Sequence, residues 1–388
     1  MQNSDPKPRI IIAQSTKKER IAKIQAALAR DADEIAYFSE VGLRLHGPIP
    51  SNTAIDIAVN SANRQKKTKL FRYLKRHFLI AQFRWCDAFL RRRPDATLIV
   101  WNGIKGHRGL FALAATMQNR RVVYLEEAPF PKRITVDSVG VNFGSSLPRD
   151  IDFYNQWART VDVAQEGWRA IKDTLKSRKA AVRKDVQHAP ATSELADQKF
   201  IFCPLQVPGD SQITIYGDWI KSVEQFIDVV AKASKSLPEG WHLRIKEHPT
   251  SSISFAEKLA SVSSTRLRVD NRTDTMQQVD LSQGVLTINS SVGLQAFFYD
   301  KPVLVLGHAF YTFDDLGTKI PDAQTLERVF SDPSTLTYNA EHRNSFMNYL
   351  DQVYYPTEED VLSGKFDLNT LAQRDTTLHG ALCKKTQR

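Results

Sequence analysis

The chain has 388 residues, of which 42% are hydrophobic and 25% are charged, and its formal net charge is +10. This length fits two domains of ordinary size, and the surplus of positive charge favours anionic partners such as nucleotides, acidic sugars or a membrane face. No apolar run approaches the ~20 residues of a membrane-spanning helix, and residues 1–9 are polar, unlike a secretory signal, so we expect a cytoplasmic protein.

The first half of the chain alternates strand-like runs with amphipathic stretches. Strands are expected at residues 9–13, 95–101 and 121–126, and helices at 17–29, 107–117 and over much of 154–184. The polar segment 185–198, which contains a proline, is predicted to be a linker.

The alternation restarts after this segment. Strands are expected at 199–204, 241–246, 267–269, 285–288 and 302–306, and helices at 218–234, 254–261 and 291–299. Strands alternating with helices predict parallel sheets with right-handed crossovers. We therefore predict an α/β protein with two Rossmann-like lobes, at residues 1–190 and 199–320, followed by C-terminal helices and a tail at 321–388.

Three polar clusters follow predicted strands of the second lobe, where ligands bind in such sheets. Gln206 to Asp210 contains Pro-Gly-Asp, which is typical of a turn, although a carboxylate at a strand end also suits a nucleophile or base. Lys246 and His248 precede Pro249 and have the charge and hydrogen-bonding groups to hold a phosphate, or they form a surface turn.

The third cluster runs from Asn289 through Ser290 and Ser291 to Gly293, where a strand leads into a helix. The two hydroxyls suit helix capping, and the first N–H groups of a helix suit a phosphate. Gly293 would allow close approach of the backbone. Ordinary capping explains the serines but not the whole string.

In this order the three clusters resemble those of bacterial capsule-polysaccharide β-Kdo glycosyltransferases, which carry Gln-x-x-x-Asp, Lys-x-His-Pro and Asn-Ser-Ser/Thr-x-Gly motifs. The similarity continues through residues 302–303 and 307–311. In the first lobe, Asn102-Gly103 and the stretch from Glu126 and Glu127 to Pro131 look like the family, although Ala128-Pro129 replaces its usual glycine and aromatic residue. The similarity covers roughly residues 95 to 311.

The resemblance implies a GT-B fold, with a CMP-Kdo donor on the second lobe, an acceptor on the first, and C-terminal helices that cross back. It also implies retention of configuration, with Asp210 as nucleophile, Gln206 positioning the site, and Glu126 or Glu127 as general base. We expect His248, Ser290, Ser291 and Lys246 to hold the CMP phosphate, with Asn289 and Gly293 beside them and Asn102 and Gly103 on the acceptor side. No metal or other cofactor is expected, and the three cysteines share no ligand spacing.

Residues 64–93 contain eleven Lys or Arg and one acid. Leu70, Leu74, Phe78, Trp85 and Phe89 recur near helical spacing, which predicts a helix with these residues toward the core. The basic surface is either a solvated helix face or a face toward a lipid-linked acceptor at an anionic membrane. No nucleic-acid-binding module accompanies the charge, so nucleic acid is not an expected partner.

Two other functions fit the same residues. One is a GT-B transferase with another CMP- or CDP-linked donor, such as a sialyltransferase or a polyol-phosphate transferase. The other is a non-catalytic basic protein that binds polysaccharide or a membrane. The acceptor, whether a capsule lipid or an O-antigen-type glycan, the oligomeric state and any continuation of the chain are not determined by the sequence.

Overall fold

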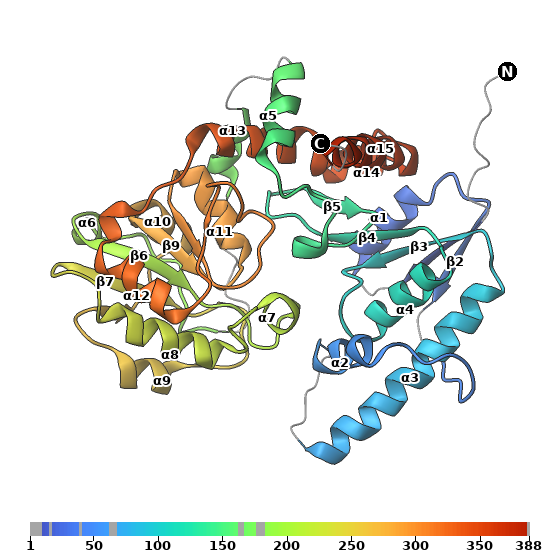
Figure 1. Ribbon diagram of the computed structural model, residues 1–388, viewed down its shortest axis with the longest axis horizontal. Coiled ribbons are helices and arrows are strands. Elements are labelled where there is room, and N and C mark those ends of the chain that lie inside the picture. Colours follow the sequence, from blue (N-terminus) through green and yellow to red (C-terminus); the bar gives the residue numbers. More distant parts are fainter. Residues whose placement is uncertain are drawn as a thin grey trace. The chain divides into compact units, whose positions relative to one another are not determined.

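The structure is a computed structural model, and it describes residues 10–14, 18–38, 41–61, 68–161, 167–175 and 183–385. The chain forms two compact α/β units (Figure 1). Unit 1 comprises Met1–Ala128, Lys132–Pro148 and Asp351–Arg388, and unit 2 comprises Pro129–Pro131 and Arg149–Leu350.

Unit 1 is built on a five-stranded sheet in the order β2-β1-β3-β4-β5. Its strands are β1 (Ile10–Gln14), β2 (Glu34–Phe38), β3 (Ala96–Trp101), β4 (Val122–Glu127) and β5 (Ile134–Asp137). The first four are mutually parallel, and β5 pairs antiparallel with β4.

Helices cover both faces of this sheet because successive strand residues point to opposite sides. Leu98 and Val100 of β3 belong to the core beneath α2 (Asn52–Ser61), α3 (Lys69–Arg91) and α4 (Gly106–Met117). Ile99 belongs to the opposite core with α1 (Glu19–Leu28), α14 (Glu358–Ser363) and α15 (Leu368–Lys385). The C-terminal helices thus return to unit 1, where Arg374 donates a 2.6 Å hydrogen bond to the Val136 carbonyl of β5.

Unit 2 contains a six-stranded parallel sheet in the order β11-β10-β9-β6-β7-β8. The strands are β6 (Lys199–Pro204), β7 (Trp241–Lys246), β8 (Leu267–Val269), β9 (Gly284–Thr287), β10 (Val303–Val305) and β11 (Thr318–Lys319). The chain adds β7 and β8 on one side of β6, and then β9, β10 and β11 on the other. The strand order therefore reverses between β6 and β9, as in a Rossmann fold, and ligands bind at the carboxyl edge of such a reversal.

The helices of unit 2 are mostly short. They are α5 (Ile151–Thr160), α6 (Ser193–Ala196), α7 (Ser211–Tyr216), α8 (Val223–Ser234), α9 (Ala256–Val262), α10 (Thr275–Leu281), α11 (Ser291–Gln295), α12 (Ala323–Ser331) and α13 (Ala340–Tyr349). Apolar side chains of β6, β7, β9 and β10 pack in one core with α8, α9 and α12. Buried aromatic rings join α5 to α13, with Tyr154 and Tyr349 5.3 Å apart.

The α/β class and the parallel sheets agree with the sequence prediction, and β6, β7 and β8 have the predicted bounds. The division between units falls at residues 148 and 149, whereas the first lobe was predicted to extend to 190. The supposed linker, 185–198, lies inside unit 2, where Gln187 N–H donates to the Asn271 carbonyl and Ala189 bridges to Thr273. Among the described residues, none of the helices is both long enough and apolar enough to span a bilayer.

The prediction for α3 was wrong in its first half. Leu70, Leu74 and Phe78, expected in the core, are exposed, and the core side of this helix is formed by Leu79, Ile80, Phe83, Cys86 and Leu90. Apolar residues recur at helical spacing on the exposed face as well as on the core face, so the pattern alone did not distinguish them. Only the second half of the helix packs against the sheet. Arg64, Lys66 and Lys67 of the basic segment lie outside the described residues.

Candidate functional site at the carboxyl edge of the second sheet

The three predicted clusters of unit 2 follow the adjacent strands β7, β6 and β9. Since these strands are parallel, the residues that follow them lie along one edge of the sheet, on both sides of the strand-order reversal. The structure therefore brings Gln206, His248 and Asn289 to the same edge. The next strand along, β10, places His308 there as well.

Gln206 and Asn289 join β6 to β9 at the reversal. Gln206 Nε2 donates to Asn289 Oδ1 at 3.0 Å, and the backbone N–H of Asn289 donates to Gln206 Oε1 at 3.1 Å. Asn289 Nδ2 donates to the carbonyls of Gln212 (2.7 Å) and Tyr216 (2.9 Å) in α7. Both side chains are buried, so this network fixes the loop after β6 to the loop after β9.

Asp210 lies at the end of a tight turn. Its N–H donates to the Val207 carbonyl at 3.1 Å, with Pro208 second in the turn and Gly209 third at φ +74°. This is the pattern of a type II turn, in which a positive φ favours glycine. Asp210 Oδ1 then accepts from the N–H of Gln212 at 3.1 Å and caps α7. The cap fixes the orientation of the carboxylate. The segment can therefore be a turn and also present a carboxylate as nucleophile or base.

His248 is half-buried, and its tautomer follows from its neighbour. The backbone N–H of Thr250 donates to Nδ1 at 3.2 Å. Because a backbone N–H can only donate, Nδ1 is an acceptor, and the proton of the neutral ring lies on Nε2. His248 can therefore donate a hydrogen bond through Nε2, as a phosphate ligand must.

Glu247, beside His248, is a buried residue with several hydrogen-bond partners that was not among the residues predicted from the sequence. Its carboxylate pairs with Arg183 at 3.0 and 3.1 Å and accepts from the N–H of Phe255 at 2.7 Å and from Asn271 Nδ2 at 3.1 Å. These bonds hold the segments around residues 183, 255 and 271 against the end of β7. Glu247 therefore fixes the loop that carries His248 and is fully engaged in doing so.

Lys246 has a different surrounding from the one expected of a phosphate ligand. It is buried, and Nζ donates to the carbonyls of Gln187 (2.7 Å), Thr273 (2.6 Å) and Asn271 (3.3 Å). Burial lowers the pKa of Lys246 to about 8, which Asp270 and Asp274 partly offset. Its three N–H groups thus hold backbone carbonyls together and are not directed at a ligand.

Ser290 and Ser291 are half-buried at the start of α11. Ser290 Oγ accepts from the N–H of Val292 at 3.2 Å, and the N–H of Ser290 donates to Thr287 Oγ1 at 3.0 Å. The glycine at 293 has a packing reason, since a Cβ there would lie 2.4 Å from the hydroxyl of buried Tyr311. That hydroxyl donates to the Ser290 carbonyl at 2.5 Å, so Gly293 and Tyr311 together support the Asn-Ser-Ser loop.

His308 is a further group at this edge that the candidate list from the sequence did not include. Its backbone N–H donates to the Tyr216 carbonyl at 2.8 Å, and its Nε2 lies 3.8 Å from Asp218 Oδ1. Lys319 Nζ binds the other oxygen of Asp218 at 2.8 Å. The family similarity at residues 307–311 was the only sign in the sequence that His308 belongs with the other candidate residues. An imidazole N–H at this edge can donate a hydrogen bond to an anionic ligand such as a sugar carboxylate.

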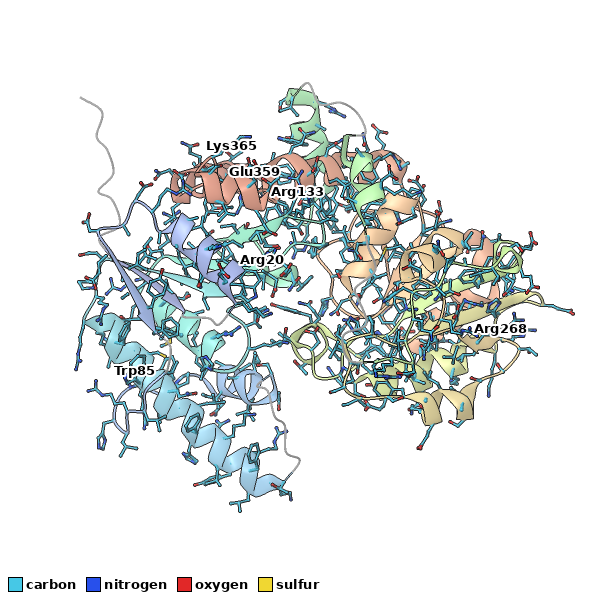
Figure 2. The ribbon with its side chains drawn as sticks, turned by 180° about the vertical axis from the view of Figure 1, so that it is seen from behind. Arg20, Trp85, Arg133, Arg268, Glu359 and Lys365 are labelled. Atoms are coloured by element: carbon cyan, nitrogen blue, oxygen red, sulfur yellow. The ribbon has the colours of Figure 1, made fainter. Side chains whose placement is uncertain are left out.

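In unit 1, the structure distinguishes the two candidate glutamates. Glu126 accepts a hydrogen bond from Asn102 Nδ2, so two predicted residues meet at the ends of β3 and β4. Glu127 points to the other side of the strand, where it is exposed and pairs with Arg20, which also binds Glu358. Figure 2 marks Arg20.

Gly103 is required by local geometry. Its φ is +67°, and a Cβ would lie 2.5 Å from the ring of Tyr124. Asn102, at φ 66°, accepts from the N–H of Ile104 at 3.3 Å while its amide holds Glu126. The Asn-Gly pair thus forms a turn that orients the Glu126 carboxylate.

Among the residues that the structure describes, no group of three or more His, Cys, Asp or Glu side chains is placed to hold a metal ion. The edge of unit 2 instead offers imidazoles, hydroxyls and a carboxylate. Such groups bind anions and supply a nucleophile.

Two Rossmann-like units with C-terminal helices returning to the first define a GT-B-like protein. Residues 185–349, which form most of unit 2 and contain all three clusters, match the family model described as "Capsule polysaccharide biosynthesis protein".

Several curated proteins are similar to the chain. Protein FixF of Sinorhizobium fredii is 28% identical over 303 residues, covering 78% of this chain and 68% of that protein. The capsule polysaccharide modification protein LipB of Neisseria meningitidis serogroup B is 28% identical, covering 45% of each. The capsule polysaccharide export protein KpsS of Escherichia coli is 25% identical, covering 48% of this chain and 60% of that protein. The chain therefore spans less than two thirds of these two capsule proteins.

Among solved structures, a Thermosulfurimonas dismutans chain described as KpsC, beta Kdo 2,7 transferase is similar with a TM-score of 0.49 and 13% identity, covering 94% of this chain and 99% of that one. The Staphylococcus aureus MnaA–UDP co-structure has a TM-score of 0.36 and 13% identity, covering 88% and 95%.

Proposed function

We propose that the protein is a retaining glycosyltransferase that transfers Kdo from CMP-Kdo to a glycan or glycolipid acceptor in bacterial surface-polysaccharide synthesis. The observation that carries the proposal is the joining of two motifs by the buried Gln206–Asn289 pair, which holds the loop of Asp210 beside the loop of Ser290. The match of residues 185–349 to the capsule-polysaccharide family model supports capsule synthesis as the setting.

The donor is assigned to the carboxyl edge of unit 2. The CMP phosphate is bound by His248 through Nε2–H and by the hydroxyls of Ser290 and Ser291, and charge on the leaving phosphate is stabilised by these donors. Lys246 is left out of this set because it binds three carbonyls. The carboxylate of the sugar is assigned to His308, whose imidazole can donate a hydrogen bond at this edge of the sheet.

In the first step, an oxygen of Asp210 attacks the anomeric carbon of Kdo. A bond forms between this carbon and the carboxylate oxygen, and the bond to the phosphate oxygen breaks, so CMP leaves with the electron pair. The configuration is inverted, and the sugar is held as an ester on Asp210. The cap to Gln212 N–H keeps the carboxylate oriented during the attack.

In the second step, the acceptor hydroxyl attacks the same carbon, and the bond to Asp210 breaks. The proton of the hydroxyl passes to a carboxylate, for which we assign Glu126 because Asn102 orients it. Glu127 is engaged with Arg20 and is assigned a structural role. The second inversion gives net retention.

The test is intact-protein mass spectrometry after incubation with freshly made CMP-Kdo, with released CMP measured in parallel. We expect a Kdo adduct on the wild type that maps to residue 210 and is absent from Asp210→Asn. Asp322→Asn is the matched control, because Asp322 also caps a helix of unit 2, accepting from Thr325 N–H, but lies outside the proposed site. This control keeps the adduct and the turnover.

Each other outcome removes a defined part of the proposal. Consumption of CMP-Kdo with acceptor but without any adduct refutes the double displacement and leaves the donor. Use of another CMP- or CDP-linked donor, with no binding of CMP-Kdo, refutes Kdo as the sugar. Binding of polysaccharide without turnover of any donor, unchanged in Asp210→Asn, refutes an enzyme altogether.

A further inference from the structure

The first half of α3 presents an apolar surface to solvent. Leu70, Leu74 and Phe78 are one turn apart along the helix, and they are 68%, 57% and 49% exposed. Tyr73 beside them is 60% exposed. Figure 1 shows this end of α3 extending past the sheet of unit 1, while the second half of the helix packs beneath α4. Three large apolar side chains in one exposed row, with a tyrosine beside them, are more than the scattered apolar residues of an ordinary surface.

The surface continues onto the loop before α2. The N–H of Arg44 donates to the Ala81 carbonyl at 3.1 Å, one turn beyond Phe78, and Arg84 donates to the Leu45 carbonyl. Trp85, marked in Figure 2, lies under the loop so closely that a Cβ on Gly42 would lie 2.4 Å from its indole nitrogen. The loop is thus fixed on the helix.

Three apolar side chains of this loop also face solvent. Leu43, Leu45 and Ile49 are 57%, 76% and 61% exposed. We call the exposed apolar residues of the loop and of α3 the apolar face: Leu43, Leu45, Ile49, Leu70, Tyr73, Leu74 and Phe78.

The segments that carry the apolar face are basic. Residues 41–50 and 68–86 contain six Lys or Arg and no acid: Arg44, Lys69, Arg72, Lys75, Arg76 and Arg84. On the side of α3 opposite the exposed row, Arg76 pairs with Asp56 of α2 at 2.6 Å and Arg72 donates to Asn60 at 3.0 Å. These contacts brace the helix without covering its apolar row.

We propose that the apolar face docks on an anionic lipid bilayer, with its leucines and Phe78 in the interfacial region and neighbouring basic residues, among them Arg44 and Lys69, at the headgroups. Large apolar side chains beside basic ones, without acids, complement a surface that is apolar inside and negatively charged outside. A protein partner would have to supply both a matching groove and acidic residues. This inference concerns unit 1 and does not depend on the donor or the reaction, so either proposal can fail alone.

The experiment is flotation of the full-length protein with vesicles, without donor or acceptor. Wild type is expected to float with vesicles of phosphatidylcholine mixed with phosphatidylglycerol, and to remain behind with phosphatidylcholine alone. The variant Leu70→Gln/Leu74→Gln/Phe78→Gln keeps good helix formers and is expected to lose more than about tenfold in partitioning. Arg44→Gln/Lys69→Gln is expected to weaken binding at low salt and to change it little at high salt.

The matched control is Met117→Gln/Leu362→Gln, which removes two exposed apolar side chains from unit 1 outside the apolar face and should bind as wild type does. Thermal unfolding of every variant checks that unit 1 is intact. Equal flotation of the triple variant and wild type overturns the proposal, as does wild-type binding that is indifferent to phosphatidylglycerol. Self-association that the triple variant abolishes, without any effect on flotation, overturns it in favour of a second copy as the occupant.

Discussion

Replacing Asn289 with alanine tests whether the Gln206–Asn289 pair builds the site. The change removes the bond from Gln206 Nε2 (3.0 Å) and those to the carbonyls of Gln212 (2.7 Å) and Tyr216 (2.9 Å). The Tyr216 carbonyl keeps the N–H of His308, so the groups that lose a partner are the buried Gln206 amide N–H and the partly buried Gln212 carbonyl. At roughly 1–3 kcal/mol for each unsatisfied buried group, we expect a loss of about 3 kcal/mol in the free energy of unfolding of unit 2.

The assay is urea unfolding, in which a loss of this size moves the midpoint down by roughly 1 M if the slope is unchanged. Donor affinity is measured in parallel from the thermal stabilisation by CMP-Kdo, which depends on the dissociation constant. Asn344→Ala is the control: Asn344 accepts from the Trp168 indole N–H at 2.8 Å, away from the strand ends, and its loss should lower stability without changing donor affinity. A loss below about 1 kcal/mol for Asn289→Ala, with donor affinity unchanged, would refute the argument.

Three further changes test separate parts of the structure. Burial lowers the pKa of His242 from 6.5 to about 4, so between these pH values the unfolded chain binds a proton that the folded chain does not. The free energy of unfolding should therefore fall by about 3 kcal/mol as the pH drops from 6.5 to 4. In urea titrations at several pH values, His242→Phe should remove this dependence. Gly293→Ala should cost about 2 kcal/mol in thermal unfolding through contact with Tyr311, and an unchanged stability would contradict the packing. Glu126→Gln should slow transfer to the acceptor by about a hundredfold or more, whereas Glu127→Gln should change it little; the reverse order in steady-state rates would exchange their roles.

The parallel sheet of unit 2 was predictable because its strands are short apolar runs bounded by polar loops. The two-residue β11 and the short helices α7 and α10 were not, because such elements depend on tertiary contacts more than on local pattern. The division between the units was also missed. Residues 185–198 have the composition of a linker, yet their backbone is bound to Asn271 and Thr273.

The sequence predicted which residues of unit 2 lie at one edge of the sheet, but not the environment of each residue. The sequence placed Lys246 and His248 together after one strand, but Lys246 is the last residue of β7 and is buried, whereas His248 lies in the loop that follows. The Lys246 side chain is buried under the strap of residues 187 and 271–273. The sequence likewise did not show the packing reason for Gly293, because its partner Tyr311 is distant in sequence.

The strand order explains why the site requires a buried amide pair. At the reversal, β6 and β9 are neighbours in the sheet although they are not consecutive strands of the chain. Gln206 and Asn289 supply donors and acceptors on both sides of this reversal, and Asn289 extends the connection to the carbonyl end of α7. Gly307 permits it, since a Cβ there would lie 2.7 Å from the Tyr216 carbonyl. The positions of Asp210, Ser290 and His308 are therefore coupled through one network, and a change at its centre should affect all three.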